Sequence, residues 1–288
     1  MDYRSPGSVK EAVDLLAASG GGAHVLAGGT DMLVKLRAGF VVPKLVVDLK
    51  SIPQLRGVSR DARGFRIGAA TSCAEIGEHA ELAAAWPGVV EALRLIGSTQ
   101  IQGRASLGGN LCNASPAADS VPALIAADAV CEVAGPSGER EVPVEQIVTG
   151  PGRTCLAAGD FVLGFRLPNP PARSGDAYLR LIPRTEMDIA VVGVGVALAL
   201  DAAGVCTQAR VALGAVAPTP LLVADAAKAL IGTRVDDKAL AALAAAASAA
   251  CKPIDDKRGT VEYRVKVAGV LARRAAGIAL ERAQARRG

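Results

Sequence analysis

Apolar positions near the start of the chain follow a helical spacing and a strand-like run in turn. Apolar residues recur every three or four positions over 9–16, directly behind Ser8, which stands three residues before a glutamate as in a capping box. Short apolar runs over 24–27 and 45–49 indicate buried strands, and a short helical segment over 32–38 lies between them. This order predicts a small α/β subdomain.

The pattern changes from about residue 63, where short strands and helices alternate without a repeat. Strand-like runs lie at 65–68 and 161–167, and apolar runs at 130–134 and 139–142 flank a Gly-Pro-Ser-Gly sequence that is typical of a hairpin turn. The predicted helices start at Ser72, span about 89–96, and run from an Asp119 or Ser120 cap to about residue 128.

A segment rich in proline and small polar residues, 169–176, is the predicted domain boundary. Three strand-like runs and then three helical segments follow it, which are 177–182, 189–200 and 209–216, and 222–231, 236–251 and 261–284. We therefore divide the chain into a first domain, 1–176, with subdomains of about 1–55 and 56–176, and a C-terminal domain, 177–288.

Composition narrows the possible functions. Aromatic residues make up 3% of the chain, and the net charge is a mild +4. Proteins that bind single-stranded nucleic acids stack the bases on aromatic side chains, so this composition argues against that function. A solvated helix face explains the basic C-terminal run better than a nucleic-acid or membrane surface. That run comprises Arg273, Arg274, Arg282, Arg286 and Arg287.

The N-terminus lacks the apolar core of a signal peptide, and the longest apolar run is too short to span a bilayer, so we expect a cytoplasmic protein with no transmembrane segment.

The cysteines and histidines argue against a metal centre. Six cysteines are widely spaced and form no C-x-x-C pair, so we expect them to be reduced and buried rather than ligands of zinc or of an iron–sulfur cluster. The chain has two histidines, His24 and His79. We expect no metal and no general acid or base, since no Ser/His/Asp or paired-carboxylate arrangement stands out.

Two glycine-containing turns carry the candidate chemistry. Gly28-Gly29-Thr30-Asp31 separates a predicted strand from a predicted helix, and Gly108-Gly109-Asn110 follows Ser106. Paired glycines permit positive φ, and successive N–H groups in such a turn can hold a phosphate without lysine or arginine. Each turn alone is more often an ordinary tight turn, and Asp31 would repel a phosphate beside it. The two turns together favour a diphosphate site.

Other nucleotide motifs are missing. The P-loop sequence G-x-x-x-x-G-K-[ST] does not occur. Gly193 and Gly195 follow an apolar run without the third glycine of a dinucleotide-binding fingerprint, so we interpret them as part of a tightly packed strand.

These motifs resemble those of a known family. Residues 27–31 (Ala-Gly-Gly-Thr-Asp) and 106–119 (Ser-Leu-Gly-Gly-Asn onward to Asp) closely resemble the FAD-binding, or medium, subunits of the xanthine dehydrogenase / carbon monoxide dehydrogenase / 4-hydroxybenzoyl-CoA reductase family of molybdenum hydroxylases. Residues 183–190 and 258–264 agree with it as well. The resemblance implies an α+β fold, with a two-subdomain FAD-binding unit of the vanillyl-alcohol-oxidase-like (PCMH) type. A C-terminal three-stranded antiparallel sheet with a helical bundle follows.

The resemblance also implies which residues contact FAD. The first motif is expected near the diphosphate and consists of Val25, Leu26, Ala27, Gly28, Gly29, Thr30, Asp31 and Met32. The second consists of Ser106, Leu107, Gly108, Gly109 and Asn110. Asp119 is expected to accept hydrogen bonds from FAD hydroxyls, although a helix N-cap would explain it equally well. The remaining expected contacts are Ile96, Leu163, Arg180, Asp188 and Ile189, for which core packing, an ion pair or a strand start are alternatives.

The implied function is electron transfer through one non-covalent FAD. A small partner with two [2Fe–2S] clusters would reduce the flavin, a large partner with a molybdenum–pterin cofactor would hydroxylate the substrate, and NAD⁺ or a quinone would accept the electrons, in a dimer of heterotrimers. The chain lacks the four-cysteine insertion of the 4-hydroxybenzoyl-CoA reductase type, so that subgroup's extra cluster is not expected. Carbon monoxide is not favoured as a substrate, because carbon monoxide dehydrogenase subunits are expected to differ around the second motif, where residues 110–113 of this chain read Asn-Leu-Cys-Asn. The alternatives are a stand-alone FAD-dependent oxidoreductase with its own substrate, and a scaffold with an empty site.

Overall fold

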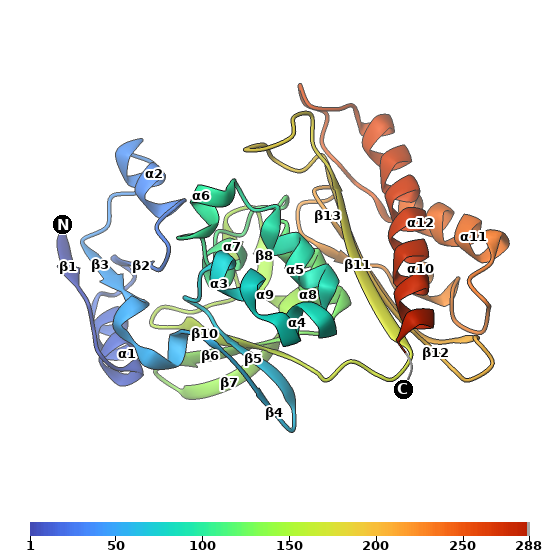
Figure 1. Ribbon diagram of the computed structural model, residues 1–288. Helices are drawn as coiled ribbons and strands as arrows, with labels where there is room; N and C mark the ends of the chain where they lie inside the picture. The colour runs from blue at the N-terminus through green and yellow to red at the C-terminus, as the bar shows by residue number, and fades with distance from the viewer. Residues whose placement is uncertain (287–288) are drawn as a thin grey trace.

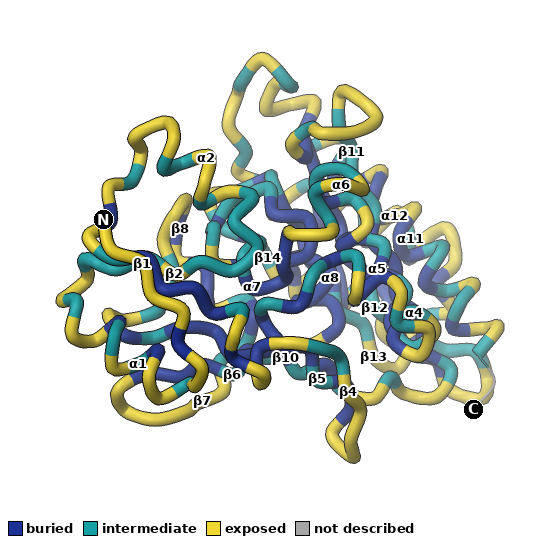
Figure 2. The backbone as a smooth tube through the Cα atoms, turned by 60° about the vertical axis from the view of Figure 1, so that its left-hand side comes forward, coloured by how far each residue is buried: buried dark blue, intermediate teal, exposed yellow. Residues whose placement is uncertain are grey.

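The computed structural model describes residues 1–286, whose strands form four sheets. Three parts of the chain follow one another across the molecule, from the N-terminal strands at one end to the long C-terminal helix at the other (Figure 1). Buried backbone runs through the sheets of all three parts, whereas the chain around α2 (Met32–Arg37) is exposed or half-buried (Figure 2).

The first part is a small parallel sheet with one packed helix. Its strands, in the order β1 (Asp2–Arg4), β3 (Leu45–Asp48) and β2 (Ala23–Leu26), are all parallel. Helix α1 (Val9–Ala18) starts at the predicted capping box, where the Ser8 hydroxyl accepts from the Glu11 amide at 3.2 Å and the Glu11 carboxylate accepts from the Gly7 amide at 2.9 Å. The second acceptor contact falls one residue earlier than in the usual box. The short helices η1 (Leu49–Ser51) and η2 (Pro53–Leu55) lead into the middle part.

The middle part is built on a five-stranded antiparallel sheet. The strand order is β4 (Val58–Asp61), β5 (Gly64–Gly68), β10 (Phe161–Leu167), β6 (Val130–Gly135) and β7 (Gly138–Pro143), and the last two form the predicted hairpin. The helices packed with it are α3 (Cys73–Glu78), α4 (Ala80–Ala85), α5 (Pro87–Arg94), α6 (Thr99–Gln102), α7 (Leu107–Cys112), α8 (Ser120–Ala126) and α9 (Val144–Ile147). The strands β8 (Val148–Gly150) and β9 (Arg153–Thr154) form a small ribbon.

The C-terminal part is an antiparallel sheet covered on both faces. Its strands follow in chain order as β11 (Ser174–Leu181), β12 (Val192–Leu200), β13 (Cys206–Gly214) and β14 (Leu221–Leu222). The helices are α10 (Ala224–Lys228), α11 (Asp237–Ala250) and α12 (Val261–Ala285), and α12 lies along β11 and β12 (Figure 1). Helices α5 and α8 of the middle part cover the opposite face.

The sheet therefore has four strands, and the predicted count of three is wrong. Leu222 was expected to open a helix, but Leu221 and Leu222 pair with Leu213 and Ala212 of β13. Proline at 220, two residues after another proline, holds the residue before it in an extended conformation, so the chain enters this segment as a strand. A two-residue strand carries too few positions for its periodicity to be recognised.

Glycines let the helices approach the C-terminal sheet closely. A β-carbon on Gly195 of β12 would lie 2.5 Å from the Pro122 carbonyl oxygen of α8, and one on Gly175 of β11 would lie 2.2 Å from the Ala279 carbonyl oxygen of α12. The interpretation of 193–195 as a tightly packed strand is thus confirmed.

Two C-terminal arginines pack against the middle part instead of lining a solvated face. Arg282 forms an ion pair with Glu91 of α5 and donates to the Asp176 carbonyl oxygen at 2.6 Å. Arg286 donates to the Ala84 and Ala85 carbonyl oxygens at 2.6 and 2.9 Å. The prediction of a solvated face is wrong for both, and Arg287 lies outside the described residues.

The cysteines are free, as expected, but only three of the six are buried, and Cys251 is half-buried. Cys112 and Cys155 are exposed, whereas Cys73, Cys131 and Cys206 are buried. Within residues 1–286, no helix has the length and apolar character needed to cross a bilayer.

Candidate functional site

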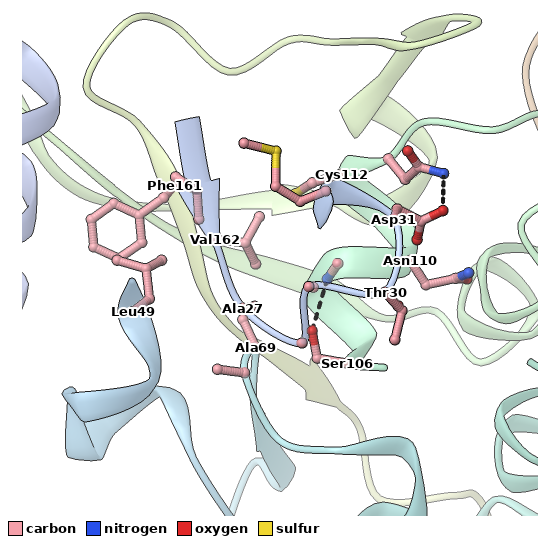
Figure 3. A pocket seen from close by; sticks show the side chains of 18 of the residues that line it. Ala27, Thr30, Asp31, Leu49, Ala69, Ser106, Asn110, Cys112, Phe161 and Val162 are labelled. Carbon is pink, nitrogen blue, oxygen red and sulfur yellow. Dashed lines mark hydrogen bonds between the residues drawn. The ribbon is translucent and has the colours of Figure 1, made fainter. Parts of the chain in front are cut away.

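A cavity of about 390 Å³ lies where the first part meets the middle part. Its walls come from the turn between β2 and α2, from the start of α7, and from the first residues of β10 (Figure 3). Twelve of the residues expected to contact FAD line it: Val25, Ala27, Gly28, Gly29, Thr30, Asp31, Met32, Ile96, Ser106, Gly108, Gly109 and Asn110. Segments about eighty positions apart in the sequence thus face one space.

Gly28 brings the two motifs together. A β-carbon on Gly28 would lie 1.8 Å from the Arg104 carbonyl oxygen, which is inside any permitted contact distance, so only glycine fits there. Arg104 precedes Ala105, whose carbonyl oxygen accepts from the Cys73 amide at 2.8 Å. The turn after β2 therefore rests directly on the strand-like segment that leads into Ser106.

The second motif is a helix start, and the prediction of a turn there is wrong. The Ser106 hydroxyl accepts from the Gly109 amide at 3.1 Å and caps α7, so Gly108 and Gly109 are helical. Gly108 is needed for space, because its β-carbon would lie 2.7 Å from the Ala69 carbonyl oxygen. Of the four glycines, Gly29 has a positive φ, at +82°.

The turn after β2 contains main-chain N–H groups that have no acceptor among the described residues. Within residues 1–286, no protein acceptor takes the N–H groups of Gly29, Thr30 or Asp31. Consecutive unpaired N–H groups form a concavity that suits an anion, and a diphosphate offers the acceptor oxygens they lack. The Ser106 hydroxyl uses its lone pair for Gly109 and keeps its hydrogen available for a second acceptor. The residues present therefore fit the diphosphate of FAD.

The Asp31 carboxylate belongs to a polar cluster at the edge of the cavity. The Asn113 amide donates to the Asp31 carboxylate at 3.2 Å and accepts from the Lys35 ammonium at 2.5 Å, and Figure 3 shows the first of these contacts. Burial raises the pKa of Asp31, and the positive charge of Lys35 opposes that rise. Lys35 also lines the cavity.

Three of the expected apolar contacts lie away from the cavity lining. Leu107 and Leu163 are buried in the hydrophobic core, at 0% and 3% exposure. Leu26 ends β2 and is not part of the lining, whereas its neighbours Val25 and Ala27 are. Core packing accounts for Leu107 and Leu163, which was the alternative for Leu163.

Asp119 and Arg180 are brought together, but outside the cavity lining. One carboxylate oxygen of Asp119 accepts from the Arg180 guanidinium at 2.7 Å and the other accepts from the Tyr178 hydroxyl at 2.9 Å. Asp119 stands at the N-cap position of α8 without capping it through its side chain. Burial raises its pKa to about 6, although Arg180 and Tyr178 act in the opposite direction. This triad joins α8 to β11.

Asp188 and Ile189 lie on the loop between β11 and β12, away from the cavity lining. Asp188 accepts from its neighbour's amide at 2.8 Å and from Arg184 at 3.3 Å, which is the local ion pair weighed as an alternative. The same loop reaches the middle part, because the Met187 amide donates to the Gly97 carbonyl oxygen at 3.3 Å. Gly97 follows Ile96, so the C-terminal part touches the chain beside the cavity wall.

Several cavity residues carried no signal in the sequence. Phe161 and Val162 were assigned to a strand, and nothing in a strand pattern shows which end faces a cavity (Figure 3). Ala69, Ala70 and His24 likewise line the cavity only through the tertiary fold. Lys35 and Asn113 could have been found by asking which polar residues flank the two motifs.

Comparisons with known proteins agree with this geometry. Residues 1–170 match the model of the FAD binding domain in molybdopterin dehydrogenase, and residues 177–279 match the CO dehydrogenase flavoprotein C-terminal domain. The chain is 36% identical to the carbon monoxide dehydrogenase medium chain of Afipia carboxidovorans over 99% of its own length and 97% of that protein. It is 30% identical to the xanthine dehydrogenase FAD-binding subunit of Escherichia coli O157:H7, over 91% and 90%.

Solved structures show the same likeness. A chain of the reconstituted CO dehydrogenase from Oligotropha carboxidovorans superposes with a TM-score of 0.94 at 35% identity, covering 98% of both chains. A chain of quinoline 2-oxidoreductase from Pseudomonas putida 86 gives 0.89 at 27% identity, again covering 98% of both. The chain belongs to the family of FAD-binding medium subunits of the molybdenum hydroxylases, oxidoreductases that include carbon monoxide dehydrogenase and xanthine dehydrogenase.

Proposed function

We propose that the chain holds one non-covalent FAD in the cavity between β2–α2 and α7. The observation that carries this proposal is the turn at 29–31, whose residues line the cavity together with Ser106 and whose N–H groups have no acceptor among the described residues. The diphosphate would rest on these donors, and Gly28 and Gly108 would let the backbone segments around the cavity pack closely against Arg104 and Ala69. Ile96 and Val25 would supply apolar contacts.

The bound flavin would serve as an electron relay between subunits. Flavins exchange electrons singly or in pairs, which allows them to connect iron–sulfur clusters with a two-electron acceptor such as NAD⁺ or a quinone. A small partner with [2Fe–2S] clusters would be the donor, and a large partner with a molybdenum–pterin cofactor would hydroxylate the substrate. We expect these chains to assemble as a dimer of heterotrimers in the cytoplasm. The names of the relatives, which are medium chains and FAD-binding subunits, support this division of labour.

The residues of this chain would bind and orient the cofactor without taking part in proton transfer. The acidic side chains of the cavity are already engaged, since Asp31 accepts from Asn113 and Asp160 accepts from Arg140 at 2.7 Å. The buried apolar residues Leu55 and Val162 of the cavity wall exclude water from one side. The subdomain limit at 55/56 and the domain limit at 176/177 remain predictions.

A stand-alone oxidoreductase is the less favoured reading, because relatives that match nearly the whole chain are subunits of larger enzymes. Purification of the native complex through a tag on this chain tests the choice. We expect molybdenum, iron and FAD in the complex, and after dissociation we expect the flavin to stay with this chain and the metals to leave. A colourless chain that cannot be reconstituted with FAD would support an empty scaffold instead. Turnover of an organic substrate by this chain and FAD alone would establish the stand-alone enzyme.

A further inference from the structure

A polar cluster at the edge of the cavity ties the two glycine motifs together. Asp31 ends the first motif and Lys35 lies one turn further along α2, while Asn113 caps the C-terminal end of α7. The Asn113 side chain stands between the two charges, accepting from Lys35 at 2.5 Å and donating to Asp31 at 3.2 Å. The Asn113 amide thus links α7 to Asp31 and Lys35, which lie about eighty positions earlier in the sequence.

Asp31 poses an electrostatic problem for an anion site. Its carboxylate belongs to the same turn as the unpaired N–H groups, and a carboxylate and a diphosphate repel one another. Hydrogen bonding to Asn113 fixes the direction of the carboxylate, but an amide is neutral and cancels no charge. Among the residues of 1–286 that line the cavity, Lys35 supplies the permanent positive charge.

We propose that Lys35 is the charge-compensating residue of the FAD site. Its ammonium, held in place by Asn113, offsets the Asp31 carboxylate and so allows the turn at 29–31 to accept the diphosphate. The inference rests on the proposed binding of FAD in this cavity. Lys35 is a positioning residue, since it acts on the turn at 29–31 through Asp31 and Asn113.

An ordinary surface ion pair would look different. On α1, Lys10 and Asp14 are also four residues apart, and they contact each other directly at 2.6 Å with 85% and 61% of their side chains exposed. Lys35 instead lines the cavity and reaches over to the other motif. The Lys10 pair therefore offers a matched control with the same residue types, the same spacing and no cavity.

A double-mutant cycle on FAD binding tests the inference. The dissociation constant of FAD is measured by fluorescence titration of the apoprotein for the wild type, Lys35→Met, Asp31→Asn, and the double variant. We expect Lys35→Met to weaken binding about tenfold in the wild-type background. In the Asp31→Asn background the same change should weaken it less than about threefold, because no carboxylate is left to offset.

Further variants separate charge compensation from structural damage. Lys35→Arg should bind FAD within about twofold of the wild type, and Lys10→Met should do the same. An unchanged apoprotein melting temperature for Lys35→Met would show that the fold is kept. Equal losses from Lys35→Met in both backgrounds, or no loss in either, would overturn the role of Lys35 while leaving FAD binding intact. A wild-type apoprotein that binds no FAD would overturn the proposed function and this inference together.

Discussion

The carbonyl oxygen of Arg104 occupies the space where any side chain on Gly28 would begin, 1.8 Å from the position of its β-carbon. This contact joins the turn after β2 to the segment that leads into α7. The two motifs are therefore coupled through backbone, which cannot yield as a flexible side chain would.

Replacing Gly28 with alanine should separate the two motifs. The backbone clash with Arg104 forces a main-chain shift, so we expect a loss of about 1–3 kcal/mol of unfolding free energy and FAD affinity reduced by at least about tenfold. Denaturant unfolding and fluorescence titration measure the two effects. Gly7→Ala, where a β-carbon meets nothing within 4 Å, is the matched control. A fully FAD-loaded Gly28→Ala protein of normal stability would contradict this account.

Removing the Ser106 hydroxyl should affect both stability and the cofactor. Ser106→Ala loses the cap on the Gly109 amide, which costs about 1 kcal/mol, and it removes a potential donor from the cavity. Ser8→Ala removes an equivalent cap from α1, where the hydroxyl accepts from the Glu11 amide at 3.2 Å and does not line the cavity. We expect both variants to lose similar stability, and Ser106→Ala alone to bind FAD more weakly. Equal FAD affinities in the two variants would assign Ser106 a purely structural role.

Two glycine-to-alanine changes in the C-terminal part should have opposite signs. Gly195→Ala pushes a β-carbon to within 2.5 Å of the Pro122 carbonyl oxygen and should destabilise the protein by about 1–3 kcal/mol. Gly277→Ala lies within α12, where the new methyl group meets nothing within 4 Å, and should stabilise it by about 0.5–1 kcal/mol. Unfolding midpoints in denaturant give both values. Similar midpoints would mean that α8 does not pack tightly on the sheet.

Stability should fall as pH rises through the range in which Asp176 ionises. Asp176 is buried, and burial raises its pKa to about 7, against an opposing effect of Arg282. Because the folded-state pKa lies above the ordinary value of 3.8, the folded protein holds this proton more tightly. The resulting stabilisation is complete below about pH 4 and disappears as the pH approaches and passes 7.

Asp176→Asn should flatten this part of the stability profile. Chemical denaturation between pH 4 and 8 would show a smaller pH-dependent decline than in the wild type, with the rest of the profile kept. Asp225→Asn, which alters an exposed aspartate paired with Lys228, should leave the decline unchanged. Parallel profiles for wild type and Asp176→Asn would show that Asp176 keeps its charge when buried.

The sequence predicted the architecture well where local signals were strong. Helical spacing behind a capping residue placed α1, and the Gly-Pro-Ser-Gly hairpin placed β6 and β7. It failed at β14, whose two residues show no period, and at α7, where paired glycines suggested a turn. In α7 the Ser106 cap and close contact with Ala69 outweigh the weak helix propensity of glycine.

The candidate site was predictable in its centre and less so at its edges. Residues 28–32 and the start of α7 line the same cavity, as the resemblance implied. The glycines of the two motifs determine the local backbone conformation and packing, and these can be recognised in the sequence. Side chains such as Phe161 and Lys35 join the cavity through packing between distant segments, which periodicity does not encode. Asp119 shows the reverse case, since an acidic residue in the motif is used to bind Arg180 and Tyr178.

The triad of Asp119, Tyr178 and Arg180 makes the two matched regions of the chain interdependent. A fragment ending near residue 170 would retain both glycine motifs but lose Tyr178 and Arg180, the two side chains that donate to the Asp119 carboxylate. Helices α5 and α8 would at the same time expose the apolar faces that now cover β11 to β13. The C-terminal part thus supports the FAD-binding domain through packing, and we expect a chain cut near residue 170 to be less stable than the whole chain.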